Sequence, residues 1–95
     1  MNTVLITGAN RGIGLEFARQ YAADGWQVVA CCRQPQQAEA LNRLADQYKD
    51  RFSIHRLDVR ELAEIDQLSH KLQDLPIDIL INNAGPKIRS ASLED

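Results

Sequence analysis

Short apolar runs alternate along the chain with segments whose apolar residues recur every three or four positions. The first run is apolar and β-branched, the third alternates apolar with polar residues, and all have the length of strands. They predict four strands, at Thr3–Thr7, Gln27–Cys32, Phe52–Leu57 and Ile77–Ile81.

The segments between these runs have the apolar spacing of helices. The first helix is expected from Ile13 to a glycine stop at Asp24-Gly25, and Pro35 is expected to open the second in its first turn. Apolar residues mark one face of the second helix and one face of the third, which Pro76 is expected to break. These residues are Ala38, Leu41, Leu44, Ala45 and Tyr48 in the second, and Leu62, Ile65, Leu68 and Leu72 in the third. The order βαβαβαβ with short connections predicts an α/β fold with a parallel sheet and right-handed crossovers.

The turn between the first strand and the first helix carries the strongest chemical signal. Glycines stand at positions 8, 12 and 14 of Thr7–Gly14, a GxxxGxG spacing. The first glycine allows a tight exit from the strand, the second lets the backbone approach a pyrophosphate, and the third permits close packing of helix on strand. The helix N-terminus offers free N–H groups to the phosphates. An incidental glycine-rich turn is the alternative, but its place between strand and helix favours dinucleotide binding.

The residue after the second strand bears on which dinucleotide is bound. NAD-binding Rossmann proteins have an acidic residue there, which bonds the ribose 2′-hydroxyl. This chain has no Asp or Glu between Gly25 and Glu39, and Arg33 follows the strand instead. Arg11 adds a second guanidinium within the glycine turn. Guanidinium groups suit a 2′-phosphate, so NADP(H) is preferred to NAD(H). The alternative is that both arginines are solvated surface residues.

Composition and charge exclude several other classes. The chain has 95 residues, 44% hydrophobic and 25% charged, with a net charge of −2. No basic block indicates nucleic acid or a membrane surface, and no apolar run is long enough to span a bilayer. No ligand cluster surrounds the two histidines, so we expect no metal site. The adjacent Cys31 and Cys32 are expected as reduced thiols on opposite faces of a buried strand. Without a signal peptide at Met1, the expected location is cytoplasmic.

Three motifs together resemble the short-chain dehydrogenase/reductase family. They are Thr7-Gly8-x-x-x-Gly12-Ile13-Gly14, Asp58-Val59 at the end of the third strand, and Asn82-Asn83-Ala84-Gly85 after the fourth. They occur in the family's order and spacing and cover essentially the whole chain. Cys31-Cys32-Arg33 followed by Gln37-Ala38 resembles the carbonyl-reductase-like and C-factor-like branch. The resemblance implies a Rossmann-type, doubly wound parallel sheet with strand order 3-2-1-4, in which residues 1–95 are the N-terminal portion of an NAD(P)-binding domain, truncated after the fourth strand.

The resemblance also implies the cofactor contacts. Residues of the glycine turn wrap the pyrophosphate and the adenosine ribose, and Arg33 meets the 2′-phosphate. Asp58 accepts a hydrogen bond from the adenine amino group, and the Val59 N–H bonds a ring nitrogen. Asn83 and the two residues after it line the ribose and pyrophosphate, while Asn82 braces the sheet. The expected cofactor-binding residues are therefore Gly8, Asn10, Arg11, Gly12, Ile13, Gly14, Arg33, Asp58, Val59, Asn83, Ala84 and Gly85.

Several of these residues have structural alternatives. Asp58 could be a helix N-cap, since Glu61 follows three positions later. Asn82 and Asn83 could be ordinary turn residues after a strand. Thr7 is as well explained as a β-branched strand residue as by a hydroxyl hydrogen bond.

The family's catalytic residues have no counterpart in the sequence. The family uses a Tyr and a Lys four residues apart on a later helix, but Gly25 follows Tyr21 at that spacing and Phe52 follows Tyr48. No catalytic residue is therefore assigned, and the chain alone is expected to be inactive. The parent is expected to be an NADP(H)-dependent oxidoreductase that transfers hydride to or from a small-molecule carbonyl or alcohol, with a homo-oligomeric state left open. The alternatives are a non-catalytic NADP(H)-binding or dimerising module and an inactive fragment.

Overall fold

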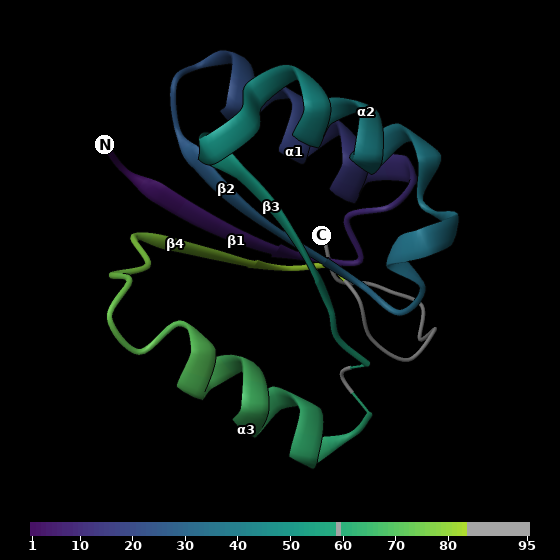
Figure 1. The fold of residues 1–95 in the computed structure, drawn as a ribbon, viewed down its shortest axis with the longest axis vertical. Coiled ribbons are helices and arrows are strands. Elements are labelled where there is room, and N and C mark those ends of the chain that lie inside the picture. The colour runs from purple at the N-terminus through teal and green to yellow at the C-terminus, as the bar shows by residue number, and fades with distance from the viewer. Residues whose placement is uncertain (59, 84–95) are drawn as a thin grey trace.

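The computed structural model describes residues 1–58 and 60–83, apart from the side chains of residues 62 and 65. It contains a four-stranded sheet with helices on both faces (Figure 1). In chain order the elements are β1 (Thr3–Thr7), α1 (Gly12–Ala23), β2 (Gln27–Cys32), the 3₁₀ helix η1 (Pro35–Gln37), α2 (Glu39–Tyr48), the 3₁₀ helix η2 (Lys49–Arg51), β3 (Phe52–Arg56), α3 (Leu62–Lys71) and β4 (Ile79–Asn82).

All strands are parallel and lie in the order β3-β2-β1-β4, as predicted. Thr7, the last residue of β1, pairs with Cys31 on one side and with Asn82 on the other. The chain winds outward from β1 through β2 to β3 and then returns to the other side of β1. The carboxyl ends of β1 and β4 therefore form a topological switch point, where open α/β sheets bind their ligands.

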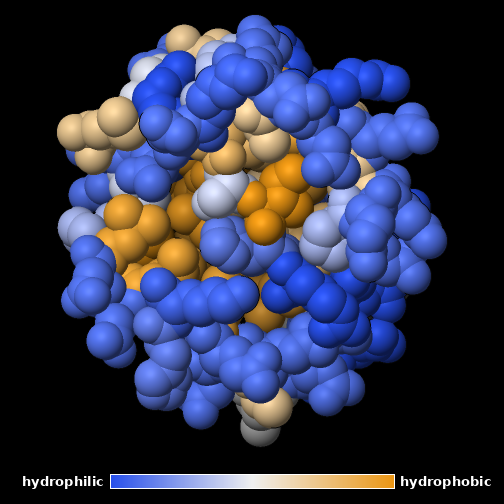
Figure 2. Space-filling view, viewed as in Figure 1, coloured by the Kyte–Doolittle hydropathy of each residue, from blue (hydrophilic) through white to orange (hydrophobic). Residues whose placement is uncertain are grey.

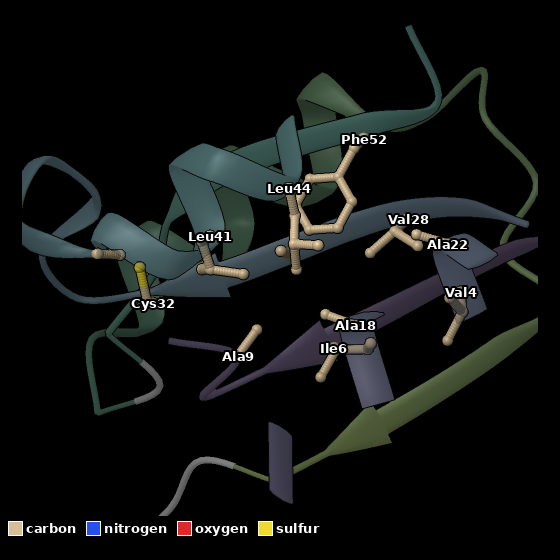
Figure 3. Packing of buried hydrophobic residues seen from close by; sticks show 12 residues of the cluster. Val4, Ile6, Ala9, Ala18, Ala22, Val28, Cys32, Leu41, Leu44 and Phe52 are labelled. Atoms are coloured by element: carbon tan, nitrogen blue, oxygen red, sulfur yellow. The ribbon is translucent and has the colours of Figure 1, made fainter. Parts of the chain in front are cut away.

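The two faces of the sheet have separate apolar cores. Helices α1 and α2 cover one face and α3 the other (Figure 1). The larger core lies under α1 and α2 and includes Ile6 from β1, Val28 from β2 and Leu41 from α2 (Figure 3). The smaller core, on the α3 face, joins Val29 and Cys31 to Leu57 and Leu68.

The neighbouring cysteines contribute to different cores because side chains alternate across a strand. Cys31 belongs to the α3 core and Cys32 to the α1–α2 core, and both are free thiols. The prediction of reduced cysteines on opposite faces is confirmed.

Helix α1 ends at the predicted glycine stop. Gly25 has a φ of 89°, and its N–H donates to the Ala22 carbonyl, while the Trp26 N–H donates to the Tyr21 carbonyl. These two bonds form the capping pattern for which a left-handed glycine is favoured. The Arg51 guanidinium also donates to the Ala22 carbonyl at 3.2 Å, so the helix end is tied to the segment that leads into β3.

Two proline predictions were wrong in detail. Pro35 opens η1 rather than α2, because the chain leaves the helical conformation at Ala38 (ψ 74°), whose side chain is buried in the core. Helix α3 ends at Lys71, well before Pro76, and the intervening residues form turns. A proline disfavours helical backbone in the residue before it, and here the helix has already unwound before that residue is reached.

The last two strands also differ from prediction at their ends. Strand β3 ends at Arg56 rather than Leu57, and β4 runs over Ile79–Asn82 rather than Ile77–Ile81. At the start of β4, the Asp78 carboxylate accepts the Thr3 N–H at 2.7 Å, and the Asp78 N–H donates to the Thr3 carbonyl. These bonds hold Asp78 beside the first residue of β1, where the β4 ladder begins.

Part of the α3 face of the sheet is exposed. Leu5 and Leu80 pair across β1 and β4, and Leu80 is 63% exposed. Figure 2 shows apolar surface in the middle of the view, between the α1–α2 layer and α3 of Figure 1. Among the described residues, no helix has the length and apolar character needed to cross a membrane.

The first turn of α1 packs directly against the end of β1. A Cβ atom at Gly14 would lie 2.2 Å from the Gly8 carbonyl oxygen and 2.8 Å from Nδ2 of Asn83. Only a residue without a side chain fits there, so the predicted packing role of the third glycine is confirmed.

We predict that Gly14→Ala destabilises the chain. Alanine favours a helix over glycine by about 1 kcal/mol, but a backbone oxygen at 2.2 Å cannot move aside without shifting β1 or α1. The net loss of unfolding free energy is expected at about 1–3 kcal/mol, measured by urea denaturation. The control Ala23→Ser, at an exposed position of the same helix, should stay within about 0.5 kcal/mol of the wild type. A Gly14→Ala chain as stable as the wild type would contradict the close approach.

We also predict that both thiols resist labelling in the folded chain. Cys31 is fully buried and Cys32 is 3% exposed. Burial raises the pKa of Cys31 to about 12 and raises the pKa of Cys32, so both remain protonated at pH 8. Because the thiolate is the reactive form, a thiol reagent should label both cysteines at pH 8 only after urea unfolds the chain. Rapid labelling of the native chain would refute this packing.

Candidate cofactor site at the carboxyl edge of the sheet

The β1–α1 turn leaves the start of α1 open. Gly8 and Gly12 have φ angles of 62° and 59°, which favour glycine. Arg11, the N-cap residue, makes no side-chain capping bond, and the first turn carries no acidic residue. A Cβ atom at Gly12 would meet no atom within 4 Å. The N–H groups of a helix's first turn have no partner within the helix, and among the described residues nothing fills the space beside Gly12. This arrangement suits an anion.

Both neighbouring strands hold this turn in place. The Ala9 N–H donates to the Cys31 carbonyl of β2 at 3.0 Å. From the other side, Nδ2 of Asn83 donates to the Gly8 carbonyl at 3.1 Å. The turn is therefore fixed over the switch point, with Arg33 following β2 on one side and Asn83 following β4 on the other.

Thr7 and Asn82 brace the strands below the turn. The Thr7 hydroxyl donates to Oδ1 of Asn82 at 2.9 Å. Asn82 was predicted to brace the sheet through hydrogen bonds to neighbouring backbone. It does join β4 to β1, but through the side chain of Thr7, so the predicted partner was wrong. Thr7 serves both as a strand residue and as a hydroxyl donor, and the ordinary-turn alternative for Asn82 is wrong.

The remaining turn residues face solvent. Asn10, Arg11 and Gly12 are exposed, and Ile13 is 65% exposed, a high value for an isoleucine at the start of a helix. Ile13 therefore presents an apolar surface next to the open helix start.

Arg33 and Asp58 lie near each other because β2 and β3 end together. Cys32 pairs with Arg56, and the Leu57 N–H donates to the Cys32 carbonyl at 2.9 Å. Arg33 is exposed, whereas Asp58 is only 8% exposed. Hydrogen bonds from Arg60 hold the pKa of Asp58 well below its usual range, and the positive charge of Arg33 lowers it further. The carboxylate is therefore ionised at neutral pH and acts only as an acceptor.

Two residues that the sequence did not single out fix Asp58. The Asp58 carboxylate accepts the backbone N–H and the guanidinium of Arg60. The Asp58 N–H donates to Oε1 of Glu64 at 2.8 Å, and Glu64 also pairs with Arg56. An Asp that bonds the N–H two positions later is a common turn pattern, so Arg60 could have been recognised from its spacing. Glu64 had no such signal.

The N-cap alternative for Asp58 is wrong. Helix α3 begins at Leu62 with Glu61 as its N-cap residue. Asp58 forms a separate turn in which the Glu61 N–H donates to the Asp58 carbonyl at 2.8 Å. Its carboxylate is thus turned toward Arg60 instead of the helix.

Nine of the twelve expected cofactor residues are described, and all nine lie after the carboxyl ends of the four strands. Gly8 and residues 10–14 follow β1, Arg33 follows β2, Asp58 follows β3 and Asn83 follows β4. Val59, Ala84 and Gly85 lie outside the described residues. Their predicted contacts, like those of the others, stay predictions.

The two tyrosines, Tyr21 on α1 and Tyr48 on α2, are partly buried and pack against the larger core. The Tyr21 ring meets Trp26 edge-on with centroids 4.9 Å apart, and the Arg51 guanidinium lies 5.1 Å from the Tyr48 ring centroid. Within the described part of the chain, no group of three or more His, Cys, Asp or Glu side chains is placed to hold a metal ion.

Known proteins share this sequence pattern. The fatty acyl-CoA reductase of Acinetobacter baylyi is 39% identical over 89 residues, which cover 92% of this chain and 30% of that protein. The NADP-dependent 3-hydroxy acid dehydrogenase of Escherichia coli K12 is 38% identical over 102 aligned positions, covering 97% of this chain and 39% of the relative. The chain thus spans about a third of the length of these relatives.

Solved structures share the fold as well. A carbonyl reductase from Pseudomonas aeruginosa in complex with NADP superposes with a TM-score of 0.85 at 38% identity, over 90% of this chain and 39% of that one. A short-chain dehydrogenase/reductase from Burkholderia multivorans with bound NADP gives 0.81 at 34% identity, over 99% and 42%. A family model described as short chain dehydrogenase matches residues 2–95. The chain therefore belongs to the short-chain dehydrogenase family.

Proposed function

We propose that residues 1–95 form the N-terminal, cofactor-binding portion of an NADP(H)-dependent oxidoreductase. The observation that carries the proposal is the uncapped start of α1 at Gly12, placed at the switch point between β1 and β4. A pyrophosphate would meet three favourable features here. These are the backbone N–H groups at the start of α1, the open space beside Gly12 and the exposed guanidinium of Arg11. The NADP complexes of two structural neighbours support the same assignment.

Each part of the carboxyl edge would meet a different part of the dinucleotide. The turn from Gly8 to Gly14 would hold the pyrophosphate against the open helix start. Asp58, ionised and only 8% exposed, would accept a hydrogen bond from the adenine amino group. Asn83 would remain bonded to the Gly8 carbonyl and so keep the turn in the shape that the phosphates require.

Arg33 and Arg11 would select NADP(H) over NAD(H). Both are exposed, and Arg33 follows β2 at the position where an NAD-specific protein carries a carboxylate. A 2′-phosphate adds negative charge and several acceptor oxygens, which guanidinium groups bind strongly.

When the cofactor is bound, its reduced nicotinamide would supply the hydride that converts a small-molecule carbonyl into an alcohol. In the reverse reaction the oxidised nicotinamide would accept the hydride. The described residues would hold and orient the cofactor, and neither Tyr21 nor Tyr48 is followed by a lysine at the family's spacing. We therefore propose that the catalytic groups belong to the remainder of a longer cytoplasmic protein of the carbonyl-reductase-like branch. The 38% identity to the Pseudomonas carbonyl reductase favours that branch.

A non-catalytic NADP(H)-binding or dimerising module is the second candidate. Its support is the exposed apolar surface on the α3 face, where Leu80 is 63% exposed. A second copy could cover such a surface, whereas an oxidoreductase would cover it with its own later helices.

We predict that Arg33→Asp changes cofactor preference. The variant loses a charged hydrogen-bond donor and places a carboxylate beside the 2′-phosphate. Affinity for NADPH should fall about 10- to 100-fold, since a hydrogen bond to a charged group is worth about 1.5–3 kcal/mol. Affinity for NADH should change less than about threefold. Isothermal titration calorimetry with both cofactors gives these ratios.

Arg43→Asp is the matched control for Arg33→Asp. Arg43 is an exposed arginine on α2, and its side chain is 78% exposed. The same change of charge at this position should leave both affinities nearly unchanged. Equal losses of NADPH and NADH affinity in Arg33→Asp would defeat the proposed role of Arg33.

We predict that the purified 95-residue chain binds NADPH without oxidising it when a carbonyl compound is added. Absorbance at the reduced nicotinamide band, followed with a panel of aldehydes and ketones, should stay constant. Turnover by a chain of verified mass would show that residues 1–95 contain their own catalytic groups. It would overturn the proposal that these groups belong to the remainder of a longer protein.

A further inference from the structure

The contacts of Asp58 leave its carboxylate with little freedom. Oδ1 accepts two hydrogen bonds from Arg60, one from the backbone N–H and one from Nε, both at 3.0 Å. Oδ2 accepts a third from Nη2 of the same arginine at 2.9 Å. The guanidinium and the carboxylate therefore meet in a two-pronged, planar arrangement that fixes the orientation of both.

These three bonds nearly saturate the carboxylate. An ionised carboxylate offers about four lone-pair positions. Arg60 occupies both positions on Oδ1 and one on Oδ2, which leaves a single acceptor position on Oδ2. The Asp58 side chain is 11% exposed, so little of it meets solvent.

The backbone of Asp58 is held from the other side. Glu64 on α3 accepts the Asp58 N–H at 2.8 Å and pairs with Arg56 at the end of β3. The Leu57 N–H, one residue earlier, donates to the Cys32 carbonyl of β2. The main chain is thus fixed by β2 and α3, and the carboxylate by Arg60.

We propose that Arg60 is a positioning residue that aims the remaining acceptor of Asp58 at the exocyclic amino group of adenine, and so sets the preference of the site for adenine. This inference rests on the proposed binding of NADP(H). A single acceptor position matches a single N–H donor. A base with a carbonyl oxygen at that position would place an acceptor against an acceptor and leave the carboxylate without its partner.

Fold stability would not reveal this role. The Arg60 side chain is 66% exposed, and exposed ion pairs contribute little to the stability of a fold. A base-preference measurement does reveal it, because it compares two cofactors that differ only in the amino group facing Asp58. These are NADPH and its purine analogue, in which a hydrogen atom replaces the adenine amino group and N1 remains an acceptor.

The test measures the affinity of the 95-residue chain for both cofactors by calorimetry. The wild type should prefer NADPH by about tenfold, as expected for a hydrogen bond to a charged acceptor. In Arg60→Gln the preference should fall below about threefold, because the carboxylate can rotate and water can fill its other lone pairs. Arg43→Gln, which removes the same charge from an exposed position on α2, should keep the tenfold preference.

A second variant separates geometry from charge. Arg60→Lys keeps the positive charge but cannot make two parallel hydrogen bonds. Its preference should fall like that of Arg60→Gln. Full preference in the lysine variant, or an unchanged or increased preference in Arg60→Gln, would overturn the positioning role. Circular dichroism of each variant confirms that the fold is intact.

Failure of this inference differs from failure of the proposed function. If the wild type does not bind NADPH, the proposed function of this chain is wrong, and the role of Arg60 falls with it. If the wild type binds NADPH but does not distinguish the two bases, cofactor binding stands, and the assignment of Arg60 and Asp58 to the amino group is overturned.

Discussion

The close contact between the first turn of α1 and the last residues of β1 is the constraint on which the site depends. The Gly8 carbonyl oxygen lies where a Cβ atom at Gly14 would be, and the same oxygen accepts a hydrogen bond from Asn83. One atom therefore joins the glycine turn, the first helix and the end of β4. Because of this contact, the start of α1 lies directly over the switch point of the sheet, and its N–H groups face the carboxyl edge.

The rest of the carboxyl edge is organised by charge. Hydrogen bonds from Arg60, together with the positive charge of Arg33, keep the pKa of the Asp58 carboxyl low. Arg33 is exposed, and its effect on Asp58 comes from its charge. The edge thus combines a positive group that is accessible to a phosphate with a carboxylate that is held in one orientation. In the proposed function, these two features would recognise different parts of the dinucleotide.

The sequence predicted the fold well because its signals are local and repeated. Strand β2 has the predicted bounds, and Gly25 ends α1 as expected, since both depend on the residues within the segment itself. Predictions failed where tertiary contacts decide the outcome. Burial of Ala38 separates η1 from α2, and bonds between Asp78 and Thr3 set the start of β4. Likewise, the spacing of its glycines predicted the turn before α1. The contact between Glu64 and the Asp58 N–H depends on how α3 packs, and no sequence pattern indicates it.

The most direct test of the account is nuclear magnetic resonance of the ¹⁵N-labelled chain during titration with NADPH. If the start of α1 binds the pyrophosphate, the amide chemical shifts of Gly12, Ile13 and Gly14 should change most, because their N–H groups would gain phosphate partners. Small shifts in that turn, with the largest changes elsewhere, would contradict this binding.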